Sequence, residues 1–456
     1  MASLAEFNIG GNMDDLLAIS SEVIDEQKVD VLINRVNQQL SEVDEGLAMV
    51  ESFSHCVAWD HGDGIACFDA SGVHTGAAVV GEIAKWRNKP ISHLFYTHGH
   101  ADHVGGSAAF AAHAQSRSDH KPLVIGHENV PGRIQRYRDT NNWNLLINAR
   151  QFGGINSDMN LSIGEASAGV EVKDTGKQAR RFLPENTLLP DQTFAEQHKM
   201  SLGGVEIELH HSKGETDDHL WCFVPEKKWI MTGDFIIWNF PNAGNPQKVQ
   251  RYPIDWARAL RKMIAQEPEL LLPAHGLPIT GKVRIARVLH EIATALEDLT
   301  TEVIRMMNEG HTLNDIIHTV KVPQETIAKP YLRPLYDEPE FVVHNVWRQF
   351  GGWWDGEASS LKPSRNSELA SAISELAGGP MVLANRAVEA MNNGDERLAC
   401  HLADLAGWAA SDDPDVHAIR ADIYNRRRKL ELSLMAKGIY KAAARDSEAV
   451  FKPAQD

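Results

Sequence analysis

One short segment of the chain is dense in side chains that bind metal ions. Residues 97–106 read THGHADHVGG and contain His98, His100, Asp102 and His103. Imidazole nitrogens and carboxylate oxygens are donors suited to zinc or iron. His98 and His100 are two residues apart, so on an extended or loop backbone both side chains point the same way and can chelate one ion. Asp102 and His103 follow after a turn, and we expect them to bind a second ion beside the first.

Three further side chains of the same kinds stand where later strand-like segments end. Glu215 lies in a turn after the segment GVEIELHH, Asp234 closes the segment KWIMTGD, and His275 closes the segment ELLLPAH. A site for two ions needs ligands beyond the first four, and strand ends are where we expect them. Two ions held by such a set lower the pKa of a bound water toward about 7 and supply a hydroxide nucleophile.

The pattern of residues 97–106 resembles the signature of the metallo-β-lactamase superfamily. The resemblance implies an α/β fold in which two sheets are stacked between helices, an αββα sandwich. It also implies how seven ligands divide between two zinc ions in each subunit. The first ion would be bound by His98, His100 and Glu215, the second by Asp102, His103 and His275, and Asp234 would bridge both.

Glu215 makes the resemblance more specific, because it is typical of one branch of the superfamily. Most relatives carry histidine in this turn, whereas glutamate in the sequence GET is similar to the zinc-dependent alkyl sulfatases of the superfamily. Three other stretches are similar to that branch: residues 127–130 (HENV) with Gly132, Arg251 placed five residues before Trp256, and residues 350–356 (FGGWWDG). The resemblance implies an alkyl sulfatase that uses a metal-bridging hydroxide. Asp102 and Asp234 would belong to its catalytic centre, and Arg251 would contact the sulfate of a small anionic ester.

Two departures from that branch keep other functions open. Asp234 stands where the branch usually has glutamate, and the sequence ends after the helical region without the sterol-carrier-like domain of the full-length enzymes. We therefore expect no preference for long-chain detergent sulfates. A phosphoester or lactone hydrolase with the same metal site is the alternative, followed by a di-iron oxidoreductase of the same fold. A non-catalytic binding protein is disfavoured by the intact ligand set.

The elements that would hold these residues alternate between strand and helix. Residues 55–60 and 65–70 predict a hairpin, residues 91–97 predict a buried strand that delivers the first ligands, and Pro253–Ala265 predicts an amphipathic helix. A short helical stretch is expected at 32–43, and loops that shape a pocket are expected at 128–193. We expect His210, His211 and His219 to support the ligands rather than bind metal, and Trp353 and Trp354 to be interface or core aromatics.

The 456 residues exceed one ordinary core, so we expect two domains of unequal size. Residues 1–50 are assigned to an N-terminal extension, residues 51–285 to the catalytic domain and residues 286–445 to a helical dimerisation domain. Apolar residues at helical spacing begin at Val288, and strand patterns end before it. We expect this helical region to make a homodimer.

Composition excludes several classes of partner. The formal net charge of −17 opposes binding to nucleic acids and anionic membranes, so metal ions and arginine must attract an anionic substrate locally. No apolar run is long enough to cross a bilayer, and the start of the sequence lacks a secretory signal. The four cysteines form no CxxC pair, which argues against a thiolate zinc site. A cytoplasmic location is the simplest expectation.

Overall fold

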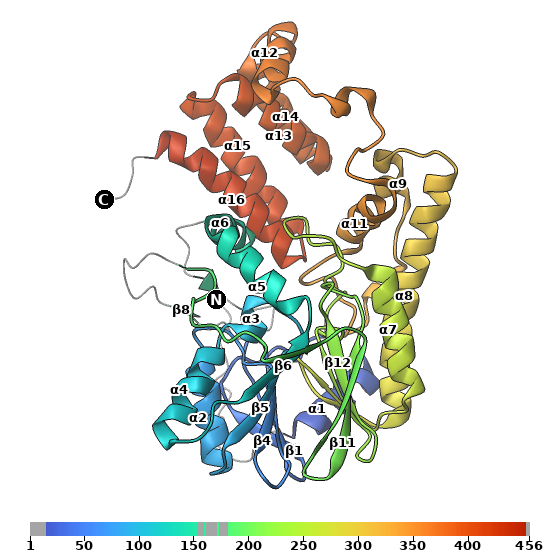
Figure 1. Ribbon diagram of the computed structural model, residues 1–456. Coiled ribbons are helices and arrows are strands. Elements are labelled where there is room, and N and C mark those ends of the chain that lie inside the picture. The colour runs from blue at the N-terminus through green and yellow to red at the C-terminus, as the bar shows by residue number, and fades with distance from the viewer. Residues whose placement is uncertain (1–14, 153–158, 161–170, 173–180, 453–456) are drawn as a thin grey trace, which may run out of the picture.

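Two β-sheets face each other, and helices cover the outer side of each (Figure 1). The computed structural model describes residues 15–152, 159–160, 171–172 and 181–452. In spatial order, the first sheet contains β1 (Leu40–Asp44), β2 (Leu47–Val50), β3 (Cys56–Asp60), β4 (Ile65–Phe68), β5 (Ile91–Phe95), β6 (Leu123–His127) and β9 (Gln192–Phe194). The second contains β10 (Gln197–Leu202), β11 (Val205–His211), β12 (Leu220–Val224), β13 (Trp229–Gly233), β14 (Leu270–Pro273) and β15 (Ile279–Thr280). A separate short pair joins β7 (Met159–Asn160) to β8 (Glu171–Val172).

Alternating side chains divide the core into two layers. On β3, Val57 and Trp59 belong to the cluster between the sheets, whereas Cys56 and Ala58 belong to the cluster on the outer side of the first sheet. Helices α2 (Gly76–Trp86) and α4 (Ser107–Arg117) cover the first sheet, and α7 (Pro253–Ala265) and α8 (Lys282–Asn308) cover the second. The predicted αββα sandwich is confirmed, and the predicted hairpin is the β3–β4 pair.

The structure differs from the sequence expectations in two places. Residues 32–43 form no helix; the chain enters β1 instead, and β1 and β2 pair at the edge of the first sheet. All four residues of β2 are buried, and residues 40–50 thus contribute two strands to the first sheet. The expected loops after residue 128 begin with two helices, α5 (Val130–Asp139) and α6 (Asn141–Gln151). Residues 153–158, 161–170 and 173–180 of that stretch lie outside the described residues.

Helices make up the chain after β15, as the sequence predicts. After α8 the elements are α9 (Leu313–Thr319), α10 (Gln324–Ile327), α11 (Pro339–Gly351), α12 (Asn366–Ala377), α13 (Pro380–Asn392), α14 (Glu396–Ala409), α15 (Pro414–Arg427) and α16 (Leu434–Phe451), with short 3-10 helices at Ala358–Leu361 and Arg428–Leu430. Helix α16 returns to pack against α6 (Figure 1). A shorter helix, α1 (Leu16–Glu26), precedes the first sheet. Within the described ranges, no helix is long and apolar enough to cross a membrane.

Close packing explains why Gly106, the second of the two glycines that end the segment 97–106, is a glycine. A Cβ atom added to Gly106 would lie 2.1 Å from the carbonyl oxygen of Ala70 and 2.8 Å from the Cα of Gly76. The start of α2 therefore lies directly against the loop that carries the predicted ligands. Any side chain at residue 106 would push these two backbones apart.

We expect Gly106→Ala to lower the free energy of unfolding by about 1–3 kcal/mol, because overpacking forces the backbone to shift. Urea denaturation measures the change. Gly81→Ala on α2 is the matched control, because a Cβ there meets nothing within 4 Å. That control should be neutral or stabilising by roughly 0.5–1 kcal/mol, since alanine has less backbone entropy to lose in a helix. Equal stabilities of Gly106→Ala and the parent protein would contradict the packing argument.

Candidate metal centre

All seven predicted ligands meet at one edge of the sandwich, where strands end. The loop after β5 leads into the short helix α3 (Ala101–Val104) and carries His98, His100, Asp102 and His103. The other three come from the second sheet: Glu215 from the β11–β12 connection, Asp234 from the end of β13, and His275 from the end of β14. The two sheets thus contribute the ligands from opposite sides.

The seven side chains fall into two adjacent groups. Ligand atoms of His98, His100, Glu215 and Asp234 all lie within 4.8 Å of one another, and so do those of Asp102, His103 and His275.

Asp234 lies between the two groups. Its Oδ2 is 3.7 Å from His98 Nε2, while its Oδ1 is 3.3 Å from His103 Nε2 and 3.4 Å from His275 Nε2. One carboxylate therefore faces both groups of donors, as a bridging ligand must.

Several donor atoms of this centre are buried without a hydrogen-bond partner in the described structure. They are His103 Nε2, Glu215 Oε2 and Asp234 Oδ1. A buried polar atom left unpaired costs about 1–3 kcal/mol, and more when the group is charged. Four imidazoles and three carboxylates that converge on one place, with these three atoms unpartnered, fit a pair of divalent cations, and nitrogen and oxygen donors of this kind suit zinc.

The charges in the centre act strongly on one another. Burial lowers the pKa of His98 and His100 well below the ordinary value, and nearby positive charges lower it further. Burial opposes charge on His103 as well, but the carboxylates around it hold its pKa well above the ordinary value. Burial favours a raised pKa at Asp234, yet the neighbouring histidines hold it well below the usual range. The lowered pKa of His98 and His100 favours their neutral form, which is the form that binds a metal ion.

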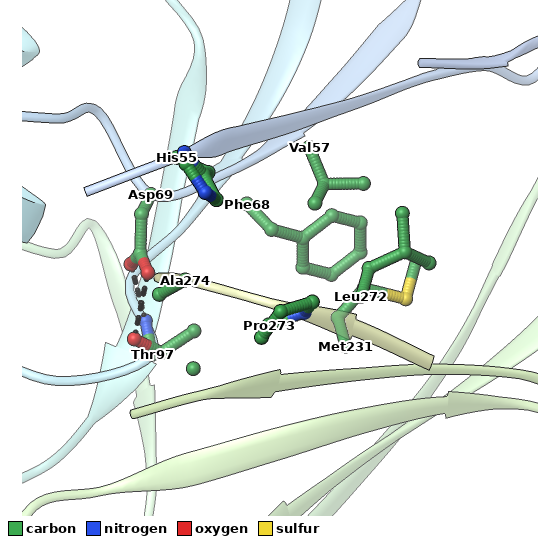
Figure 2. Close-up of a pocket in the computed structure, with 10 residues that line it drawn as sticks. His55, Val57, Phe68, Asp69, Thr97, Met231, Leu272, Pro273 and Ala274 are labelled. Atoms are coloured by element: carbon green, nitrogen blue, oxygen red, sulfur yellow. Dashed lines mark hydrogen bonds between the residues drawn. The ribbon is translucent and has the colours of Figure 1, made fainter. Parts of the chain in front are cut away.

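Asp69 orients the ligand loop, and sequence reasoning did not single it out. Its Oδ2 lies 2.8 Å from His103 Nδ1, and the same carboxylate accepts hydrogen bonds from the backbone N–H and hydroxyl of Thr97 at 2.8 and 2.7 Å. Figure 2 shows Asp69 and Thr97 beside a small cavity between the sheets. Asp69 directly follows β4, which pairs in parallel with β5. This position at a strand end was the sequence signal that could have identified it. The contact turns His103 Nε2 toward the donors.

A second aspartate that the sequence analysis omitted ties the Glu215 turn to the ligand loop. Asp218 Oδ2 accepts a hydrogen bond from the Gly99 N–H at 2.9 Å, and its Oδ1 accepts one from Arg133 Nε at 3.0 Å. Arg133 lies on α5, so the helix, the turn and the loop between His98 and His100 are joined by one buried carboxylate.

The neighbouring histidines lie outside the two donor groups. His219 Nε2 accepts a hydrogen bond from the backbone N–H of Asp234 at 3.1 Å, so it supports that ligand. His210 stacks on Trp221, and His211 stacks on the ring of His127. Of the two tryptophans considered, Trp353 is 71% exposed and Trp354 is 38% exposed, which makes neither a core residue.

Arg251 lies beside the first group, and its predicted contact with a substrate anion stays a prediction. It is fully buried, and its Nη2 is 3.3 Å from Glu215 Oε1. Its Nη1 donates to the Glu215 carbonyl oxygen and lies 3.4 Å from His100 Nε2. Asn242 Nδ2 donates to the same carboxylate at 2.5 Å. Glu215 therefore links the guanidinium of Arg251 directly to the donor set.

Comparison with known families agrees with this geometry. Residues 69–275 match the metallo-β-lactamase superfamily, and residues 312–449 match the alkyl sulfatase dimerisation family. The chain thus combines a metallo-β-lactamase domain with an alkyl sulfatase dimerisation domain, as the sequence predicts. The proposed domain boundaries at residues 50 and 285 stay predictions.

The relatives are distant. The linear primary-alkylsulfatase of a Pseudomonas strain is 23% identical over 384 residues, which cover 81% of this chain and 69% of the relative. The alkyl/aryl-sulfatase of Saccharomyces cerevisiae is 21% identical, and a Pseudomonas (R)-specific secondary-alkylsulfatase is 25% identical; both matches cover 73% of this chain. The chain spans about half the length of these two, 51% and 50% respectively.

A solved structure shows the same fold. The stereoselective inverting sec-alkylsulfatase Pisa1 from Pseudomonas sp. superposes with a TM-score of 0.78 at 20% sequence identity. The match covers 92% of this chain and 67% of the other, so it extends through the sandwich and most of the helical region.

We expect Asp69→Asn to weaken zinc binding by about 10–100-fold, because His103 loses the carboxylate that orients its ring. Titration against a chromophoric zinc chelator measures the affinity. The exposed Asp63, in the turn between β3 and β4, supplies the control variant Asp63→Asn, which should bind zinc as the parent does. Unchanged affinity in Asp69→Asn would show that the contact does not serve a metal site.

Proposed function

We propose that this protein is a binuclear zinc hydrolase of anionic esters and acts as an alkyl sulfatase. The observation that carries the proposal is the arrangement around Asp234 and Glu215. Asp234 faces both donor groups, and Glu215 connects the first group to a buried arginine. Distant relatives named as alkylsulfatases support the choice of sulfate esters. The zinc identity, the two ions per chain and the roles of the seven ligands are parts of the proposal.

Bound zinc ions would supply a nucleophile from water at neutral pH and neutralise negative charge on the substrate. The substrate would approach from the side of Asp102, whose side chain is 29% exposed, because the His98 and His103 side chains are fully buried. Arg251 would hold the anionic head group through parallel guanidinium hydrogen bonds, since its Nη1 lies 3.4 Å from Nε2 of His100, one of the proposed ligands. Glu215 and Asn242 would keep the arginine in place.

A panel of esters tests the proposal. We expect the zinc-loaded protein to hydrolyse short alkyl sulfates with a higher kcat/KM than the matching phosphate monoesters and lactones. The reason is that a single guanidinium, that of Arg251, lies beside the buried donor groups and can balance the single negative charge of a sulfate ester. Faster turnover of phosphates or lactones would assign the protein to the alternative hydrolase class.

Variants of Arg251 refine the same experiment. Arg251→Ala should reduce kcat/KM for sulfate esters by about 100-fold, or about 3 kcal/mol, and affect neutral lactones much less. Arg251→Lys should retain more kcat/KM than Arg251→Ala but less than the parent protein, since a point charge cannot form two parallel hydrogen bonds. Arg258 on α7, with a side chain that is 67% exposed, supplies the control variant Arg258→Ala. Equal losses on charged and neutral esters would mean that Arg251 only supports Glu215.

We also propose that the helical region forms a homodimer. Leu369 and Leu376 are seven residues apart on α12, so they share one face of that helix, and they are 50% and 90% exposed. Trp353 adds further exposed apolar surface between α11 and α12. Symmetric pairing of two copies would bury such a surface. The match to a dimerisation family over residues 312–449 supports this assembly.

Light scattering at micromolar concentration should give the mass of a dimer. The double substitution Leu369→Glu with Leu376→Glu should shift the mass toward the monomer, because it places charge in the proposed contact. Glu368→Gln on the same helix is the control and should leave the mass unchanged. A monomeric parent protein would contradict the proposal.

A further inference from the structure

Two basic side chains near the metal centre have no acidic partner among the described residues. Lys248 precedes Arg251 in the chain, and its Nζ donates to Asn148 Oδ1 on α6 at 3.2 Å. Arg136 on α5 places its guanidinium 4.9 Å from the ring centroid of Tyr137. Both side chains are half-buried, and among the described residues no carboxylate lies within an ion-pair distance of either. Arg133 nearby is different, because it is paired with two aspartates.

The positive charges of Arg136, Lys248 and Arg251 are close enough to repel one another. Burial lowers the pKa of Lys248 to about 7, and the charges of Arg251 and Arg136 contribute, while Asp102 and Glu215 act in the opposite direction. Burial also lowers the pKa of Arg136, and Arg251 is among the charges that lower it further. Groups whose pKa values are perturbed by burial and by one another beside a candidate catalytic centre are candidates for a functional role, and a bound anion would offset the repulsion between these cations.

The three cations occupy different depths. Arg251 is fully buried against Glu215 and His100, whereas Arg136 on α5 and Lys248 in the segment before Arg251 are half-buried. A sulfate ester brings a single negative charge, and Arg251 is the cation next to the donor set. Arg136 and Lys248 therefore remain without a counter-charge after the ester head group is bound.

Building on the proposed function, we propose that Lys248 and Arg136 bind a second acidic group of the substrate. The favoured substrates would be short sulfate esters that also carry a carboxylate or a second sulfate, rather than plain alkyl sulfates. Arg251 would hold the ester that reacts, and the outer pair would hold the other charged end. The two residues would thus determine specificity without taking part in the reaction itself.

Two sulfate esters that differ only at the far end test this inference. We expect kcat/KM for the sulfate ester of 6-hydroxyhexanoate to exceed that for hexyl sulfate by at least ~10-fold, a difference of about 1.4 kcal/mol. Lys248→Met and Arg136→Met should each reduce the ratio of the two values, and Lys248→Arg should retain it. Lys262→Met, a change at an exposed lysine of α7, is the control and should also retain it. Equal kcat/KM values for the two esters in the parent protein would overturn the inference.

Binding of the product separates this inference from the proposed function. Calorimetric titration of the zinc-loaded protein with 6-hydroxyhexanoate should show binding that weakens at least ~10-fold in Lys248→Met, since one charge-assisted hydrogen bond is lost. If neither sulfate ester is hydrolysed but this binding depends on Lys248, the sulfatase proposal fails and the anion site stands. If hexyl sulfate is hydrolysed and Lys248→Met binds 6-hydroxyhexanoate as tightly as the parent, the second acidic site is wrong.

Discussion

The position of Asp234 between two sets of imidazoles is the constraint on which the rest of the site depends. Its two oxygens face His98 on one side and His103 with His275 on the other, and Oδ1 is buried without a hydrogen-bond partner in the described structure. Such an arrangement of buried donors is unfavourable unless cations balance it. The surrounding fold forces these donors together at a cost in folding free energy. Metal binding would offset that cost.

The fold brings the donors together by placing them at the ends of neighbouring strands. Parallel pairing of β4 with β5 sets Asp69 beside the ligand loop, and parallel pairing of β13 with β14 sets Asp234 near His275. Contacts beyond the donors then fix their orientation: Asp69 holds His103, and Asp218 holds the backbone between His98 and His100.

Sequence reasoning found the donors because histidines and carboxylates at short spacing are rare outside metal sites, and because apolar strands ending in such residues are easy to recognise. It overlooked Asp69 and Asp218, since a single aspartate after a strand looks like any other and only the pairing of strands gives it a partner. It also expected loops where α5 and α6 lie, because their sequences are polar and their few apolar side chains, such as Ile134 and Tyr137, matter only once they pack on the sheet. Lys248 could not be recognised for the same reason: its neighbours Arg136 and Asn148 are distant in sequence.

The most direct test of this account is to count and locate the metal. Elemental analysis of protein purified without added chelator, together with anomalous scattering from a crystal at the zinc edge, gives both results. The account predicts two zinc ions in each chain, one beside His98, His100 and Glu215 and the other beside Asp102, His103 and His275, with Asp234 between them. A single ion, or two ions that leave Asp234 or Glu215 without a metal contact, would contradict it.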